Sequence, residues 1–185
     1  MRTYKKIILA GAFLGLAGSA VQAADMDPAV PATTYENMGF YLRADVGWSF
    51  LDWSEGNDNN WAAGVGAGYR FNDNLRVDGR FDYAGQYHVA PGADMSVTTA
   101  LANAYFDIPT GTAFTPYLGA GVGYGWGTVD GGSDKDGFAY ALMAGVGVNL
   151  SDSVELDVGY RFRNIMASGA DPMEHQILTG IRFGF

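Results

Sequence analysis

Apolar and polar residues alternate with a period of two along most of the chain after Gly39. This pattern is typical of β-strands that have one apolar face and one polar face. We predict about eight strands, over residues 40–50, 61–72, 75–83, 95–108, 117–126, 138–149, 154–163 and 176–185. Most of them have roughly the ~9 to 11 residues that cross a bilayer when a strand is tilted.

The connections between the predicted strands alternate in length and polarity. Residues 51–60, 86–94, 130–137 and 164–172 form long polar connections, whereas residues 73–74, 109–114 and 151–153 form short ones. Asp73 and Asn74 suit a tight turn because their side chains can bond nearby backbone groups. This alternation of long and short connections predicts an all-β fold. It is typical of an antiparallel up-and-down transmembrane β-barrel with both chain ends on the periplasmic side.

One predicted strand does not keep a regular alternation of apolar and polar residues. In residues 95–108 the apolar positions change parity near Leu101, so the facing of these side chains stays open. A β-bulge near Leu101 would explain the change.

Charge placement indicates which face of the barrel meets water. A soluble ligand-binding barrel shows the same alternation, but its exterior usually carries many lysines, and the polar parity here carries none. We therefore predict that the polar face lines the lumen, with interleaved glycines leaving room for arginines to pair with acids. The predicted lumen network is Arg43, Asp45, Arg70, Arg76, Asp78, Arg80, Asp82, Glu155, Asp157, Arg161, Arg163 and Arg182, with Asp107 and Glu174 added provisionally.

The aromatic residues of the apolar parity gather at the strand ends. Trp48, Phe50, Trp61, Tyr83, Trp126, Phe138 and Phe162 lie toward the long connections, and Phe40, Phe71, Phe106, Phe183 and Phe185 toward the short ones. Two aromatic girdles around an aliphatic band match the two interfaces of a bilayer.

The first residues have the composition of a secretory signal. Arg2, Lys5 and Lys6 precede an apolar run, and Val21-Gln22-Ala23 supplies the small residue of a cleavage site. We expect residues 1–23 to be removed, residues 24–38 to form a periplasmic segment, and residues 39–185 to form the barrel. A retained anchor is the alternative.

Composition excludes some classes of chemistry and of binding partner. The 185 residues include no Cys, which excludes disulfides and thiol catalysis. After cleavage, 8 Lys and Arg would stand against 20 Asp and Glu, a net charge of -12. We expect no nucleic-acid partner, because phosphate binding needs a basic surface.

The long connections carry most of the acidic residues outside the predicted strands. We expect them to be exposed and to collect divalent cations that bridge to lipopolysaccharide phosphates or to an extracellular partner. Asp134-Lys135-Asp136-Gly137 has only part of a calcium-loop pattern, so no specific metal site is predicted. The acidic outer residues are Asp52, Glu55, Asp58, Asp94, Asp130, Asp134, Asp136 and Asp171.

The chain resembles the opacity-type, porin-family outer-membrane barrels and is similar to the OmpA-type transmembrane barrel. The resemblance rests on Phe40-Tyr41-Leu42-Arg43, on residues 102–107 and 116–124, and on the terminal Gly180-Ile181-Arg182-Phe183-Gly184-Phe185. It implies that Ile177, Ile181, Phe183 and Phe185 form the signal read by the barrel-assembly machinery. We expect no peptidoglycan-binding domain after Phe185, so the resemblance does not imply a role in wall anchoring.

These observations lead us to expect a monomeric outer-membrane barrel of a Gram-negative bacterium, with a structural and surface role, a plugged lumen, and no cofactor or catalytic residue. A small-solute porin with a narrow pore is the first alternative. A lipid-modifying enzyme at the rim is the second, with His88 or His175, the two histidines, as its base. A soluble ligand-binding barrel is the third.

Overall fold

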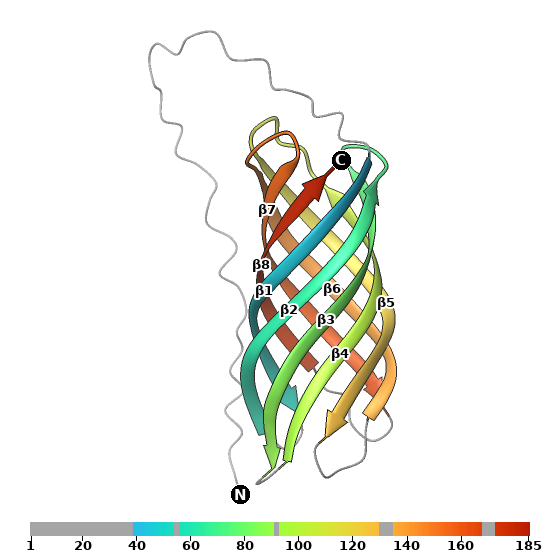
Figure 1. Ribbon diagram of the computed structural model, residues 1–185, viewed down its shortest axis with the longest axis vertical. Coiled ribbons are helices and arrows are strands. Elements are labelled where there is room, and N and C mark those ends of the chain that lie inside the picture. Colours follow the sequence, from blue (N-terminus) through green and yellow to red (C-terminus); the bar gives the residue numbers. More distant parts are fainter. Residues whose placement is uncertain (1–38, 54–55, 91–92, 130–134, 168–172) are drawn as a thin grey trace, which may run out of the picture. The chain divides into compact units, whose positions relative to one another are not determined.

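Eight antiparallel strands close into one barrel, as predicted, in the computed structural model, which describes residues 39–53, 56–90, 93–129, 135–167 and 173–185. Each strand pairs with its neighbours in sequence, and β8 pairs with β1 to close the sheet (Figure 1). The strands are β1 (Gly39–Trp53), β2 (Gly56–Arg70), β3 (Leu75–Ala90), β4 (Ala93–Asp107), β5 (Phe114–Val129), β6 (Lys135–Asn149), β7 (Val154–Ala167) and β8 (Met173–Gly184).

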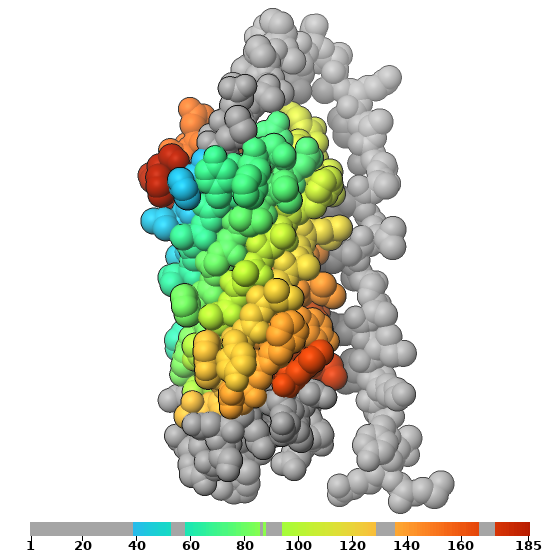
Figure 2. Space-filling model, turned by 90° about the vertical axis from the view of Figure 1, so that its right-hand side faces the viewer, coloured from blue at the N-terminus to red at the C-terminus, as the bar shows by residue number. Residues whose placement is uncertain are grey.

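The side chains alternate between the lumen and the outer wall. Leu42 is 53% exposed on the wall, while its neighbours Tyr41 and Arg43 are each 5% exposed in the lumen. Successive residues of a strand point to opposite faces of the sheet, so the apolar parity forms the wall throughout. The strands tilt against the barrel axis, and their side chains cover the wall in diagonal bands (Figure 2). None of the described residues forms a helix long and apolar enough to cross a membrane.

The two ends of the barrel differ. The turn end carries the connections at residues 71–74, 108–113 and 150–153, together with Gly39 and Phe185. The hairpin end carries the connections of β1–β2, β3–β4, β5–β6 and β7–β8. At the turn end the Asn72 side chain accepts backbone hydrogen bonds from Asn74 and Leu75, and Gly111 has a φ of 71°, a conformation that glycine adopts without strain.

The strands run further toward the hairpin end than the sequence pattern predicts. They contain 12 to 16 residues, and Trp53 still pairs with Gly56 inside the predicted connection 51–60. Backbone pairing needs no apolar side chain, so the ladder continues through polar residues beyond the predicted ends. Asp52, Asp58, Asp94 and Asp136 therefore lie in strands, not in loops.

β4 has no bulge near Leu101, which corrects the expectation for this strand. Its pairing with β5 is continuous from Met95 to Asp107, and Leu101 and Val97 face the lumen in the same parity as Asn103. The parity change in the sequence arises because the lumen itself becomes apolar toward the hairpin end. The register shifts lie in the pairing with β3, between Ala84 and Tyr87 and between His88 and Ala90.

The outward direction of the apolar side chains predicts that a charge placed on the wall lowers the free energy of unfolding by an amount that depends on its depth in the membrane. Leu142, 55% exposed, lies near the middle of β6, whereas Leu150, 60% exposed, lies at the turn end. We expect Leu142→Arg to lower the free energy of unfolding in lipid vesicles by about 2–4 kcal/mol, and Leu150→Arg by about 0–1 kcal/mol. Denaturant titration of both variants measures the difference. Equal costs would contradict the proposed facing of the middle of β6.

Candidate functional site in the barrel lumen

The inward face of the barrel brings the charged residues of six strands together. All twelve residues of the predicted network point inward, and Asp107 and Glu174 join them. Arg70, at the turn end, has the most accessible side chain of the lumen arginines, at 20% exposed. The lumen is therefore the candidate functional site.

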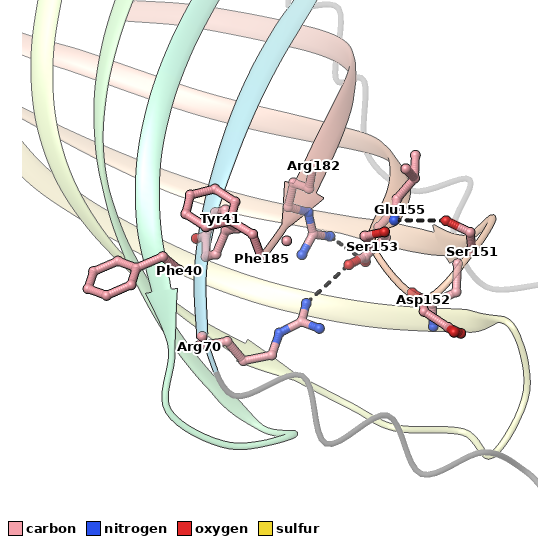
Figure 3. A pocket seen from close by; sticks show the side chains of 13 residues that line it. Phe40, Tyr41, Arg70, Ser151, Asp152, Ser153, Glu155, Arg182 and Phe185 are labelled. Carbon is pink, nitrogen blue, oxygen red and sulfur yellow. Dashed lines mark hydrogen bonds and ion pairs between the residues drawn. The ribbon is translucent and has the colours of Figure 1, made fainter.

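At the turn end, two arginines converge on one carboxylate (Figure 3). Glu155 on β7 pairs with Arg70 at 3.1 Å and with Arg182 at 2.6 Å. Arg182 also reaches Asp157 at 2.7 Å. These pairs link β2, β7 and β8 across the mouth of the barrel.

Arg76 lies deeper and is held by both charge and aromatic rings. Its Nε donates to both oxygens of Asp107, at 3.0 and 2.8 Å. Its guanidinium lies 3.9 Å from the centre of the Tyr105 ring and 4.9 Å from that of Tyr117. A cation over a ring face is stabilised by the ring quadrupole, which compensates in part for its loss of water.

The middle of the lumen contains a chain of alternating charges. Arg43 pairs with Asp45 at 2.7 Å, and Asp45 also meets Arg80 at 3.1 Å. Arg80 pairs with Asp82, whose second oxygen accepts from Arg161, both at 2.8 Å. Asp78 extends this chain by pairing with Arg43 at 3.2 Å. Charges from β1, β3 and β7 are thereby joined across the lumen.

Toward the hairpin end the network closes on Glu174. This carboxylate pairs with Arg163, whose Nε donates to it at 2.6 Å, and accepts from Tyr87 at 3.0 Å and from Ser49 at 3.3 Å. Gln176 joins by donating to Ser49 at 3.2 Å. The oxygens of Glu174 thus accept from groups on three strands, β1, β3 and β7.

In the described lumen the charges balance. Seven arginines face seven acids, and each acid makes at least one ion pair with an arginine. A charge buried without a partner would cost several kcal/mol, so this matching lets so many ionised groups lie inside the barrel.

An apolar cluster also lines the lumen. Its members are almost fully buried, although lumens of membrane barrels are typically polar. Leu101 pairs with Arg80 by register and Leu178 lies beside the middle charges. Leu51, Met95, Val97 and Ile165 lie toward the hairpin end.

Glycines on the inward parity provide the space for the large polar side chains. A β-carbon at Gly119 would lie 2.5 Å from the Tyr105 ring, and one at Gly145 would lie 2.6 Å from the Tyr117 hydroxyl. Neither ring could keep its place against an alanine. The glycine-rich strands β5 and β6 therefore face the crowded side chains of the other strands.

Two cavities involve the described lumen residues. One of about 260 Å³ opens at the turn end between the start of β1, the end of β8 and the β6–β7 turn, with Arg70, Glu155 and Arg182 in its wall (Figure 3). The other, of about 10 Å³, lies between the middle charges and has room for about one water. Both cavities are lined in part by charged side chains of the network.

Sequence reasoning missed the tyrosines and amides of the network. Tyr41, Tyr105 and Tyr117 hydrogen-bond to Asp78 or Asp157, and Asn103 donates to Asp78 at 2.7 Å. The shared parity of Tyr105 with Asp107 was the available signal, but tyrosine suits either face of a membrane barrel.

The other predicted sites are placed as follows. Ile177, Ile181, Phe183 and Phe185 all face outward. Of the acidic outer residues, Asp52, Asp58, Asp94 and Asp136 have described side chains, while those of Glu55, Asp130, Asp134 and Asp171 lie outside the described residues. Within the described part of the chain, no three acidic or histidine side chains are grouped as a metal site.

A closed barrel with an apolar wall and a charged lumen defines a transmembrane β-barrel. The family model described as "Outer membrane protein beta-barrel domain" matches residues 11–185, and the chain belongs to this family. It is an outer-membrane protein of the Gram-negative type.

Known proteins of similar sequence and structure agree with this assignment. An uncharacterised protein of Brucella suis is 32% identical over 76% of this chain and 74% of its own length. The outer membrane protein PagN of Salmonella typhimurium is 26% identical over 56% of this chain and 57% of its own. The crystal structure of Neisserial surface protein A superposes with a TM-score of 0.72, at 29% identity, over 80% of this chain and 97% of that one.

The packing of the lumen predicts that replacing two different glycines with alanine has very different effects on stability. Gly119→Ala would crowd the buried Tyr105 ring, whereas a β-carbon at the outward-facing Gly79 meets nothing within 4 Å. We expect Gly119→Ala to lower the free energy of unfolding by about 1–3 kcal/mol. Gly79→Ala should change it by less than about 0.5 kcal/mol. Denaturant titration in lipid vesicles compares them, and an equal effect of the two would refute the packing argument.

Proposed function

We propose that this protein is a closed structural and surface-exposed barrel whose lumen is plugged by its own arginines and acids. The observation that carries the proposal is the matched network itself, with seven arginines and seven acids in mutual ion pairs. Side chains engaged with each other on opposite walls occupy the path that a solute would need.

The apolar cluster supports the same proposal. Val97 and Ile165 face the lumen on the hairpin side of Arg163, and Leu51 pairs with Glu174 by register. An ion would meet apolar side chains there, and passing them would cost desolvation energy. Charge pairing and an apolar layer thus oppose conduction at successive depths.

A narrow small-solute porin is the second candidate, because a ladder of charges can also select ions. The turn-end cavity of about 260 Å³ favours it, as this cavity could serve as a vestibule. Conductance distinguishes the two candidates.

A catalytic role at the rim receives less support. His175 and Glu174 lie on opposite faces of β8, since Glu174 pairs with Arg163 inside the lumen and His175 bonds to Tyr160 on the wall. A serine, histidine and acid relay would need the acid to reach the histidine. The side chain of His88 lies outside the described residues.

The ends of the barrel would supply the interactions. We propose that the outward Phe183 and Phe185 engage the barrel-assembly machinery, and that the acidic hairpin end meets lipopolysaccharide, divalent cations or an extracellular partner. The outward exposure of Phe185, at 73%, supports the first part. The outward Asp52 and Asp136 near the hairpin end support the second.

The plug predicts that a lumen arginine matters for stability and not for conduction. Arg80→Ala would leave Asp45 and Asp82 each without one partner, and we expect a loss of about 3 kcal/mol in unfolding free energy. Arg70→Ala, at the accessible mouth, should cost less because water can replace the guanidinium. Planar-bilayer recordings of the native protein and of Arg80→Ala should show no discrete steps in single-channel current. Steps in the native protein that change in size in Arg80→Ala would establish the porin instead.

A further inference from the structure

A histidine lies on the outer wall of the barrel, among residues that face lipid. His175 belongs to the outward parity of β8, with Ile177, Ile181 and Phe183 following toward the turn end. By register it pairs with Phe50 of β1 and Phe162 of β7, and its ring lies 5.4 Å from that of Phe162. His175 is therefore part of the aromatic girdle near the hairpin end.

Tyr160 determines how the imidazole presents its second nitrogen. The Tyr160 hydroxyl and His175 Nδ1 are 2.6 Å apart. The geometry alone allows either group to donate, but a phenol donates to an imidazole nitrogen more readily than it accepts from one. In the favoured neutral tautomer the hydrogen therefore resides on Nε2, and in the charged ring both nitrogens carry hydrogen. Nε2–H is a donor in this tautomer and in the charged ring. None of the described residues accepts from it.

The height of His175 on the wall identifies its surroundings. Eight residues separate it from Phe183 of the turn-end girdle, which corresponds to about 20 Å along the membrane normal for a strand tilted by ~40°. The apolar band of such barrels is about 25 Å tall. His175 therefore lies within about 5 Å of the outer boundary of the hydrocarbon. Headgroups near that boundary supply hydrogen-bond acceptors, and a donor left unpaired there would be costly.

The wall offers no other described cationic group. The described arginines point into the lumen, and His175 is the one outward side chain among the described residues that can carry a positive charge. The nearest acid by strand register is Asp52, one outward position further toward the hairpin end, where it pairs with Met173. Among the described residues, the dyad of His175 and Tyr160 is thus the one position of this girdle where a positive charge can reside.

We propose that the His175 and Tyr160 dyad binds a phosphate group of an outer-leaflet lipid, with Nε2–H of His175 donating to a phosphate oxygen and Phe50 and Phe162 contacting the lipid beside it. This site goes beyond the proposed plug and does not depend on it. A barrel that conducts ions could still carry the lipid site.

Imidazole NMR of the native protein tests the site directly. The chain has two histidines, so His88 serves as the internal reference for His175 in a ¹⁵N-histidine sample held in maltoside micelles, which contain no phosphate. We expect diphosphoryl lipid A to shift the Nε2 signal of His175 and leave that of His88 in place. Dephosphorylated lipid A and inorganic phosphate should leave both in place. An equal response to dephosphorylated lipid A, or a response to inorganic phosphate alone, would overturn the proposal.

A matched pair of variants measures the contribution of the donor. His175→Phe keeps an aromatic ring and removes the N–H, and we expect it to retain about three- to tenfold less diphosphoryl lipid A in native mass spectrometry. Thr179→Val, on the same face of β8 within the hydrocarbon, should retain as much as the native protein. Equal retention by His175→Phe and the native protein would rule the site out.

Discussion

The pairing of buried charges inside a closed sheet is the constraint on which the rest of this structure depends. The outer wall must be apolar to lie in lipid, so the polar parity of every strand is directed into a narrow lumen. Arginines there have few waters to solvate them and must find carboxylates. Arg43, Arg80 and Arg161 do so by sharing Asp45 and Asp82 across the lumen. The result is a set of cross-links between strands that are far apart in sequence.

That requirement extends to the other lumen residues. Inward glycines on β5 and β6 leave the volume in which Tyr105 and Tyr117 lie, and these rings cover the guanidinium of Arg76. Toward the hairpin end the charges give way to Val97 and Ile165, and Leu51 pairs with Glu174 by register. The barrel therefore has a charged core toward the turn end and an apolar core toward the hairpin end. At the hairpin end the strands extend through polar residues past the girdle.

The period of two was sufficient to predict eight strands, and the parity of the arginines was sufficient to predict which face lines the lumen. Three features could not be predicted this way. Strand ends at Trp53 and Ala90 depend on backbone pairing that polar side chains do not interrupt. Leu101 faces inward beside Arg80 because the lumen contains apolar as well as charged side chains, a property of several strands together. The choice of partner, such as Arg161 for Asp82, depends on the stagger of β3 and β7 around the barrel.

The most direct test of this account is a double-mutant cycle on Arg76 and Asp107, whose pairing involves both carboxylate oxygens at 3.0 and 2.8 Å. Unfolding free energies in lipid vesicles would be measured for Arg76→Leu, Asp107→Leu and the double variant. Asp107→Leu leaves the buried Arg76 without its acid, and Arg76→Leu leaves Asp107 only the longer contact of 3.8 Å to Arg70. Each single change should cost about 3–5 kcal/mol, while the double variant should be more stable than either. Additive losses would show that the two charges are solvated independently, and that the lumen is wet and open.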